Sequence, residues 1–169
     1  SWTADLHINA KRMEDRIAAL SQFGKNPEGG VSRVAFSDAD VQGRNYIQTL
    51  MKEVGLQVRI DTAGNIIGRR EGSNPSLAPI LFGSHIDSVP GGGNYDGDVG
   101  VIAAIECIEV LKESNQITKH PLEVIVFSDE EGGLAGSRSM AGEFPESAME
   151  IKSHSGKTIR EGIRAIGGN

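Results

Sequence analysis

Histidine and acidic residues gather in three short segments of this sequence that could together bind a metal ion. In chain order they are His85, Asp87, Asp96, Asp98, Asp129, Glu130 and Glu131. Carboxylates brought to one place repel one another unless a cation neutralises them. Imidazole and carboxylate ligands without thiolate are typical of hydrolytic sites that hold zinc or a similar ion such as Mn²⁺ or Co²⁺. These residue types therefore predict a divalent-metal site.

The spacing of these residues indicates how the chemistry could be divided. His85 and Asp87 lie two positions apart at the expected end of a strand, so their side chains share one face and Asp87 could fix the tautomer of a ligating His85. Glu130 and Glu131 are adjacent, so their side chains diverge. One of the two could hold a metal ion while the other takes a proton from bound water.

Two apolar strands separated by a helix would bring the three segments together. Residues 79–83 and 122–127 are apolar runs typical of buried parallel strands, and residues 99–111 have a helical pattern. Strand, helix and strand in this order predict a βαβ unit with parallel strands. The segments after both strands then lie at the carboxyl ends of the strands, which is the edge where open α/β sheets bind ligands.

The part of the chain before these strands predicts two helices and a hairpin. Apolar residues recur at helical spacing over residues 4–20. Ser37 is placed to cap a second helix. Residues 56–60 and 66–70 flank the turn 61–65, Asp-Thr-Ala-Gly-Asn, and predict a β-hairpin.

Composition and charge exclude several classes of protein. The 169 residues carry 17 Lys+Arg and 23 Asp+Glu, a net charge of −6, so the chain is not expected to bind nucleic acid electrostatically. The longest nearly apolar stretch, residues 99–111, contains two glutamates and is too short to cross a membrane. The single cysteine, Cys107, is expected to be a buried thiol. A cytoplasmic protein of one domain is the default expectation, with export as the alternative because the native N-terminus is not seen.

The motifs also resemble a known family. Residues 83–97 read Gly-Ser-His-Ile-Asp-Ser-Val-Pro-Gly-Gly-Gly-Asn-Tyr-Asp-Gly, and with Glu130-Glu131-Gly132 they resemble the di-zinc aminoacylase/carboxypeptidase clan of metallopeptidases. Within the clan the resemblance is nearest to the branch of N-carbamoyl-L-amino acid hydrolases, β-ureidopropionases and allantoate amidohydrolases, which the turn 61–65 also fits. The resemblance implies an α/β fold of three layers, α/β/α, with a mixed, mostly parallel sheet as in zinc-dependent exopeptidases.

The same resemblance implies a role for each residue of the site. His85 would bind one metal ion, Asp96 would bridge two ions, and Glu131 would bind the second. Glu130 would be the general base, and Asp87 would orient His85. Two divalent ions are implied, zinc foremost, with manganese or cobalt as alternatives. The implied activity is hydrolysis of linear amide C–N bonds in a small-molecule substrate of the N-carbamoyl amino acid, ureido acid or allantoate type.

Two departures from the family pattern bear on these expectations. Residues 132–138 lack the Arg-Phe pair that carbamoylases carry close behind Glu-Glu-Gly, which leaves the exact substrate open. Family members are also longer, with further histidine ligands and a lid or dimerisation domain. Residues 1–169 are therefore expected to be the N-terminal portion of a single catalytic domain, weakly active or inactive alone, from a protein that forms a homodimer. Because some strands of the complete sheet would then lie outside residues 1–169, we expect an exposed apolar edge near residues 122–127.

Two other functions stay open at this point. One is a peptidase or aminoacylase of the same clan, and the other is a non-catalytic binding module that keeps the fold. The remaining histidines do not decide between them, because His7, His120 and His154 are all expected to be surface residues rather than ligands.

Overall fold

The computed structural model describes residues 5–169. Its helices and strands are, in chain order, α1 (Ala10–Ser21), α2 (Asp38–Glu53), β1 (Gln57–Ile60), β2 (Ile66–Arg70), β3 (Ile80–His85), α3 (Asp98–Glu113), β4 (Leu122–Phe127), α4 (Ala135–Met140), the 3-10 helix η1 (Glu146–Glu150) and α5 (Ile159–Ala165). The predicted hairpin and the predicted strand, helix and strand are both present.

The four strands form one mixed sheet in the order β1-β2-β4-β3. Strands β3 and β4 pair in parallel, with Ile80 opposite Leu122 and His85 opposite Phe127, which confirms the βαβ unit. The hairpin adds its strands antiparallel, β1 to β2 and β2 to β4. The mixed α/β class is therefore confirmed, but within residues 5–169 the parallel pairing is confined to one of the three strand pairs. The short turn 61–65 accounts for the antiparallel pairing of β1 with β2, because so short a connection can join only antiparallel strands.

Side-chain caps fix where the first two helices begin. The Ser37 hydroxyl accepts a hydrogen bond from the Asp40 N–H at 3.2 Å, as the sequence predicted for α2. Helix α1 begins at Ala10, later than predicted, because the Asn9 side chain accepts from the Arg12 N–H at 3.0 Å and caps the helix there. Residue 4 of the predicted helix lies outside the described residues.

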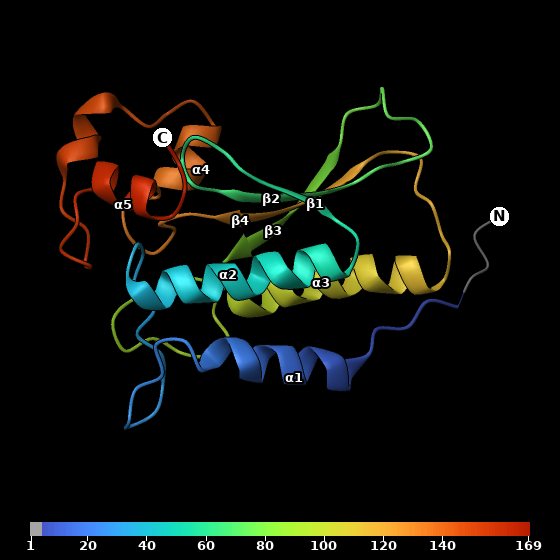
Figure 1. The fold of residues 1–169 in the computed structure, drawn as a ribbon, viewed down its shortest axis with the longest axis horizontal. Coiled ribbons are helices and arrows are strands. Elements are labelled where there is room, and N and C mark those ends of the chain that lie inside the picture. The colour runs from blue at the N-terminus through green and yellow to red at the C-terminus, as the bar shows by residue number, and fades with distance from the viewer. Residues whose placement is uncertain (1–4) are drawn as a thin grey trace.

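Helices α2 and α3 pack against one face of the sheet, and α1 lies outside α3 (Figure 1). Charge as well as apolar packing joins α1 to α3: the Glu106 carboxylate has no exposed surface and accepts from the Arg12 guanidinium at 2.7 and 2.8 Å. The expectation that Cys107 is buried is wrong. Its position on α3 faces away from the side that buries Ile105 and Ile108, so the thiol is exposed.

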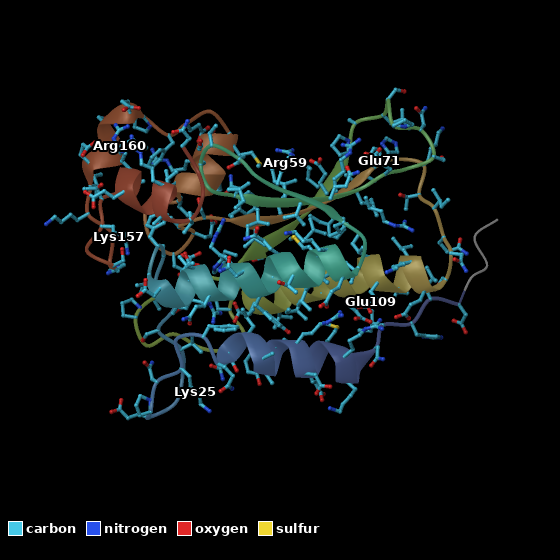
Figure 2. The ribbon with its side chains drawn as sticks, in the orientation of Figure 1. Lys25, Arg59, Glu71, Glu109, Lys157 and Arg160 are labelled. Carbon is cyan, nitrogen blue, oxygen red and sulfur yellow. The ribbon has the colours of Figure 1, made fainter. Side chains whose placement is uncertain are left out.

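The other face of the sheet is more open. Arg59, Arg69 and Glu123 form a charged group on it, and Arg59 is seen on the side of the sheet away from α2 in Figure 2. A second apolar cluster holds α4 and α5 at the end of the sheet where β4 ends (Figure 1). In the described residues the second helical layer of the predicted α/β/α arrangement is represented by α4 and α5 at that end.

The exposed apolar edge is β3 rather than β4. Ile80 and Leu81 are 51% and 52% exposed, because β3 is the outer strand of the sheet. Residues 122–127, where the sequence placed the exposed edge, form β4 between two partners and are mostly buried. Across residues 5–169, every helix is too short or too polar to cross a lipid bilayer.

Candidate metal centre

The ends of β3 and β4 bring the predicted ligands to one place. His85 is the last residue of β3 and lies opposite Phe127, the last residue of β4, so the loop after β4 runs beside His85. The loop that carries Asp96 passes close to His85 at Gly97, which has φ +76°. A Cβ there would lie 2.5 Å from the carbonyl oxygen of His85, so only glycine lets the loop that carries Asp96 approach so closely.

His85, Asp96 and Glu131 form a cluster that suits a divalent cation. One ligand atom from each residue lies within 4.8 Å of the others, and the Nε2 atom of His85 is 3.3 Å from an Oε atom of Glu131. His85 is buried, Glu131 is half-buried and Asp96 is exposed, so the cluster opens to solvent on one side. An imidazole nitrogen and two carboxylates are a donor set that zinc and similar ions accept.

The electrostatics of the cluster also fit a cation. Burial raises the pKa of Glu131 above its ordinary value, and the neighbouring Asp96 carboxylate raises it further. Burial lowers the pKa of His85, but the hydrogen bond and negative charge of Asp87 outweigh it and raise this pKa to about 9. Negative charge crowded around one point contributes to both shifts, and a divalent ion would neutralise that charge.

Asp87 connects His85 to the loop after β4. Its carboxylate is 2% exposed and accepts hydrogen bonds from the N–H groups of Glu130 at 3.2 Å and Glu131 at 3.0 Å. The Nδ1 atom of His85 lies 2.9 Å from the main-chain oxygen of Asp87 and 3.6 Å from its carboxylate. The main-chain carbonyl is thus the nearer acceptor for an Nδ1–H, and this tautomer leaves Nε2 free to bind a metal ion.

The two adjacent glutamates have different surroundings. Glu131 contributes an oxygen to the cluster, whereas the Glu130 carboxylate accepts a hydrogen bond from the Ser137 hydroxyl at 3.0 Å. The structure thereby separates two side chains that sequence spacing left equivalent. Ser137 was not singled out from the sequence, because nothing in the local pattern shows that the first turn of α4 folds back over Glu130.

Buried polar residues hold the loop that carries both glutamates. Asn65 has no exposed surface; its side chain accepts from the Ser128 N–H at 2.9 Å and donates to the Gly136 carbonyl at 3.1 Å. Asp129 lies in the left-handed region at φ +52° and accepts from the Gly133 N–H at 3.0 Å. Burial raises the pKa of Asp129 to about 6. The hairpin turn and the loop after β4 are therefore one hydrogen-bonded unit.

Asp98 and the other three histidines lie outside the cluster. Asp98 is turned toward the buried Arg33 guanidinium, at 2.8 Å, and burial raises the pKa of Asp98 to about 6. His7 and His120 are not among the clustered ligands, and His154 lines a cavity that also touches Glu131. Neither Arg33 nor the place of His154 was foreseen, because both depend on contacts between distant parts of the chain.

Comparison with known proteins places these features in context. A family model described as peptidase family M28 matches residues 65–155. The chain is 41% identical over 165 residues to the N-carbamoyl-L-amino acid amidohydrolase of Geobacillus stearothermophilus, covering 95% of this chain and 40% of that protein. It is 44% identical over 144 residues to the ureidoglycolate hydrolase of Arabidopsis thaliana, covering 82% of this chain and 30% of that protein.

Solved structures share the fold. The hydantoinase/carbamoylase family amidase from Burkholderia ambifaria superposes with a TM-score of 0.91 at 33% identity, covering 96% of this chain and 42% of that chain. The chain thus spans less than half the length of these relatives.

Proposed function

Because the chain belongs to peptidase family M28, we propose that it is the N-terminal portion of the catalytic domain of a divalent-metal-dependent amidohydrolase. The relatives confirm the resemblance to the carbamoylase branch of the metallopeptidase clan. The proposed substrates are small molecules with a linear amide C–N bond, of the N-carbamoyl amino acid, ureido acid or allantoate type. The observation that carries the proposal is the cluster of His85, Asp96 and Glu131.

The proposed metal ligands are His85 through Nε2, Glu131 and Asp96, with Asp96 bridging two ions and zinc as the expected metal. When bound, such ions lower the pKa of a water molecule and polarise the carbonyl of the substrate. Because these three side chains would give each of two ions only two protein ligands, weak metal affinity is expected for this chain alone.

Glu130 is the proposed general base. The Ser137 hydroxyl donates to one oxygen of its carboxylate, which orients the group and leaves the other oxygen available for a proton. Glu130 would take a proton from the attacking water and return it to the leaving nitrogen. Asp87 is the proposed positioning residue, because its carboxylate holds the N–H groups of both glutamates while its carbonyl oxygen faces Nδ1 of His85.

Calorimetric titration with zinc and manganese tests the metal site directly. The wild-type chain is expected to bind, and His85→Ala and Asp96→Ala are each expected to abolish binding. His7→Ala is the matched control, because His7 is an exposed imidazole on the segment before α1. Wild-type binding that neither cluster substitution weakens would overturn the assignment of the ligands.

Hydrolysis by the full-length protein tests the proposed reaction. N-carbamoyl amino acids, dipeptides and N-acetyl amino acids should be compared as substrates. The last two classes test the alternative of a peptidase or aminoacylase, which membership of a peptidase family leaves open. Preference for the carbamoyl compounds, lost in Glu130→Gln while zinc binding persists, is the expected result. Zinc binding without hydrolysis of any of these compounds would instead support the non-catalytic module. Homodimerisation and cytoplasmic location stay predictions.

A further inference from the structure

The loop between β3 and α3, residues 86–97, joins two of the three clustered side chains. His85 precedes the loop as the last residue of β3, and Asp96 lies near its other end, just before α3 begins. A ligand atom of His85 and one of Asp96 nevertheless lie within 4.8 Å of each other. The two ends of the loop must therefore be held at a fixed separation for the cluster to form.

The buried guanidinium of Arg33 contacts the chain at both ends of this loop. Its Nε atom donates to the Ile86 carbonyl at 2.7 Å, and its Nη2 atom donates to an Oδ atom of Asp98 at 2.8 Å. Ile86 follows His85 directly, and Asp98 lies two residues after Asp96. Because a guanidinium group is planar and rigid, it holds these two acceptors at a fixed separation.

The third nitrogen of Arg33 anchors the guanidinium to the end of α1. Nη1 donates to the Leu20 carbonyl at 2.9 Å and to the Phe23 carbonyl at 2.8 Å. Leu20 lies in the last turn of α1, where the helix dipole favours a cation. Helix α2 packs on the other side, since a Cβ at Gly43 would lie 2.9 Å from the Cδ atom of Arg33. The guanidinium is thus fixed by elements that do not belong to the loop.

The main chain of Arg33 also holds the loop. The Arg33 N–H donates to the Ser88 hydroxyl at 2.9 Å, and the Arg33 carbonyl accepts from the Ser88 N–H at 2.7 Å. Farther along the loop, the Gly91 N–H donates to the Ser32 hydroxyl at 2.8 Å. The loop therefore lies alongside Ser32 and Arg33, and the side chain of Arg33 reaches its two ends.

The place of Asp98 depends on Arg33. One oxygen of this buried carboxylate accepts from the guanidinium, and within the described part of the chain the other oxygen has no hydrogen-bond partner. A buried carboxylate that loses its cation is strongly disfavoured. Asp98 is the first residue of α3, so loss of Arg33 would disturb the start of this helix and Asp96 just before it.

We propose that Arg33 is a positioning residue of the metal centre, which holds the two ends of the loop 86–97 so that His85 and Asp96 meet. It acts through Ile86 and Asp98 rather than by binding the ion. That this cluster is a metal centre rests on the proposed function. The placement of the loop, however, can be measured without a metal ion.

Amide hydrogen exchange of the metal-free chain measures how firmly the loop is held. In Arg33→Met, exchange at Ser88 and Glu131 is expected to be at least about tenfold faster than in the wild type, because the loop loses a hydrogen bond to a charged group at each end. Glu131 is included because its N–H donates to Asp87 in the same loop. Calorimetric titration should show a zinc affinity about tenfold lower.

Arg12→Met is the matched control for a general loss of stability. Arg12 also pairs with a buried carboxylate of α3, that of Glu106, at 2.7 Å. Glu106 lies about 12 Å along the helix from Asp98. Its neighbour Glu109 is seen in Figure 2 on the part of α3 away from α4 and α5. This variant should speed exchange in β4 through global unfolding, but exchange at Ser88 and zinc affinity should stay as in the wild type.

Arg33→Lys gives the same test in a variant that keeps a cation beside Asp98. The single nitrogen of lysine cannot hold the Ile86 carbonyl and the Asp98 carboxylate at the spacing that a guanidinium imposes. Exchange at Ser88 is therefore expected to become faster and zinc affinity to fall, as in Arg33→Met, with a smaller loss of stability. This variant decides the question if Arg33→Met does not fold.

The outcomes separate this inference from the proposed function. Wild-type exchange at Ser88 and Glu131 in a folded Arg33 variant, or an undiminished zinc affinity in that variant, would overturn the positioning role. Equal acceleration at Ser88 in Arg12→Met would overturn it as well, because the loop would then follow global stability alone. A wild-type chain that binds no zinc would count against the proposed metal ligands, and exchange in the metal-free chain would still decide whether Arg33 holds the loop.

Discussion

Replacing Asp87 by asparagine is expected to weaken both metal binding and the folded state. The carboxylate of Asp87 accepts two backbone hydrogen bonds, from the N–H of Glu130 and the N–H of Glu131, and it is 2% exposed. An asparagine side chain has the same shape but only one acceptor oxygen. Its amide group would face one of these two N–H groups, so one hydrogen bond would be lost and the other would no longer involve a charged acceptor.

The magnitude follows from these contacts. A hydrogen bond to a charged group contributes about 1.5–3 kcal/mol, so Asp87→Asn should lower the free energy of unfolding by about that amount. The position of Glu131 would also become less defined, because its N–H is one of the two held by Asp87. Loss of residues that orient metal ligands reduces metal affinity by about 10–100-fold, and we expect zinc affinity to fall in this range.

Urea unfolding followed by circular dichroism and zinc titration by calorimetry measure the two effects. Asp38→Asn is the matched control, because it removes the same charge from an exposed residue at the start of α2. That variant should unfold and bind zinc nearly as the wild type does. Wild-type zinc affinity in Asp87→Asn, together with an unchanged free energy of unfolding, would show that this carboxylate does not hold the loop.

Three further predictions concern the residues around the site. Arg33→Met should lower the free energy of unfolding, measured in urea, by about 3–5 kcal/mol, because it leaves the buried Asp98 without its partner. Arg59→Met, at an exposed arginine, should lower it by less than about 1 kcal/mol. Equal effects of the two substitutions would contradict this prediction. Asn65→Ala should lower the free energy of unfolding by roughly 2–4 kcal/mol and also weaken zinc binding, because it removes two hydrogen bonds that hold the loop after β4. A loss of stability with unchanged zinc affinity would refute the second part of this prediction. Burial raises the pKa of Asp40 from 3.8 to about 6, so its stabilising contribution is complete below pH 3.8 and is lost as the pH rises through about 6. The free energy of unfolding should therefore fall over this range by up to about 3 kcal/mol from this residue, and urea unfolding of Asp40→Asn should show a smaller fall.

The parts of the fold that the sequence predicted are those controlled by local pattern. The cap at Ser37 and the hairpin around residues 61–65 depend on neighbours in the sequence, so they could be read directly. The parallel pairing of β3 with β4 followed from the strand, helix and strand order. The start of α1 was missed because the apolar pattern extends to residues before Asn9, whose side chain caps the helix and fixes Ala10 as its first residue.

Two predictions of which residues are buried or exposed were wrong for a different reason. Exposure of Cys107 depends on which side of α3 meets the sheet, and this cannot be inferred from apolar neighbours in a helix where several faces are apolar. The exposed edge fell on β3 because β4 lies between β2 and β3, and strand order is set by pairing between segments far apart in the chain.

For the site itself, the sequence determined which residue types could bind a metal ion and at which edge of the sheet they would meet. Only the tertiary structure decided that the Glu130 carboxylate accepts from the Ser137 hydroxyl and that Asp98 pairs with Arg33. The reason is physical: residue type and periodicity act within a few residues, whereas the direction of a buried side chain is set by the contacts and charges that folding brings to it from elsewhere in the chain.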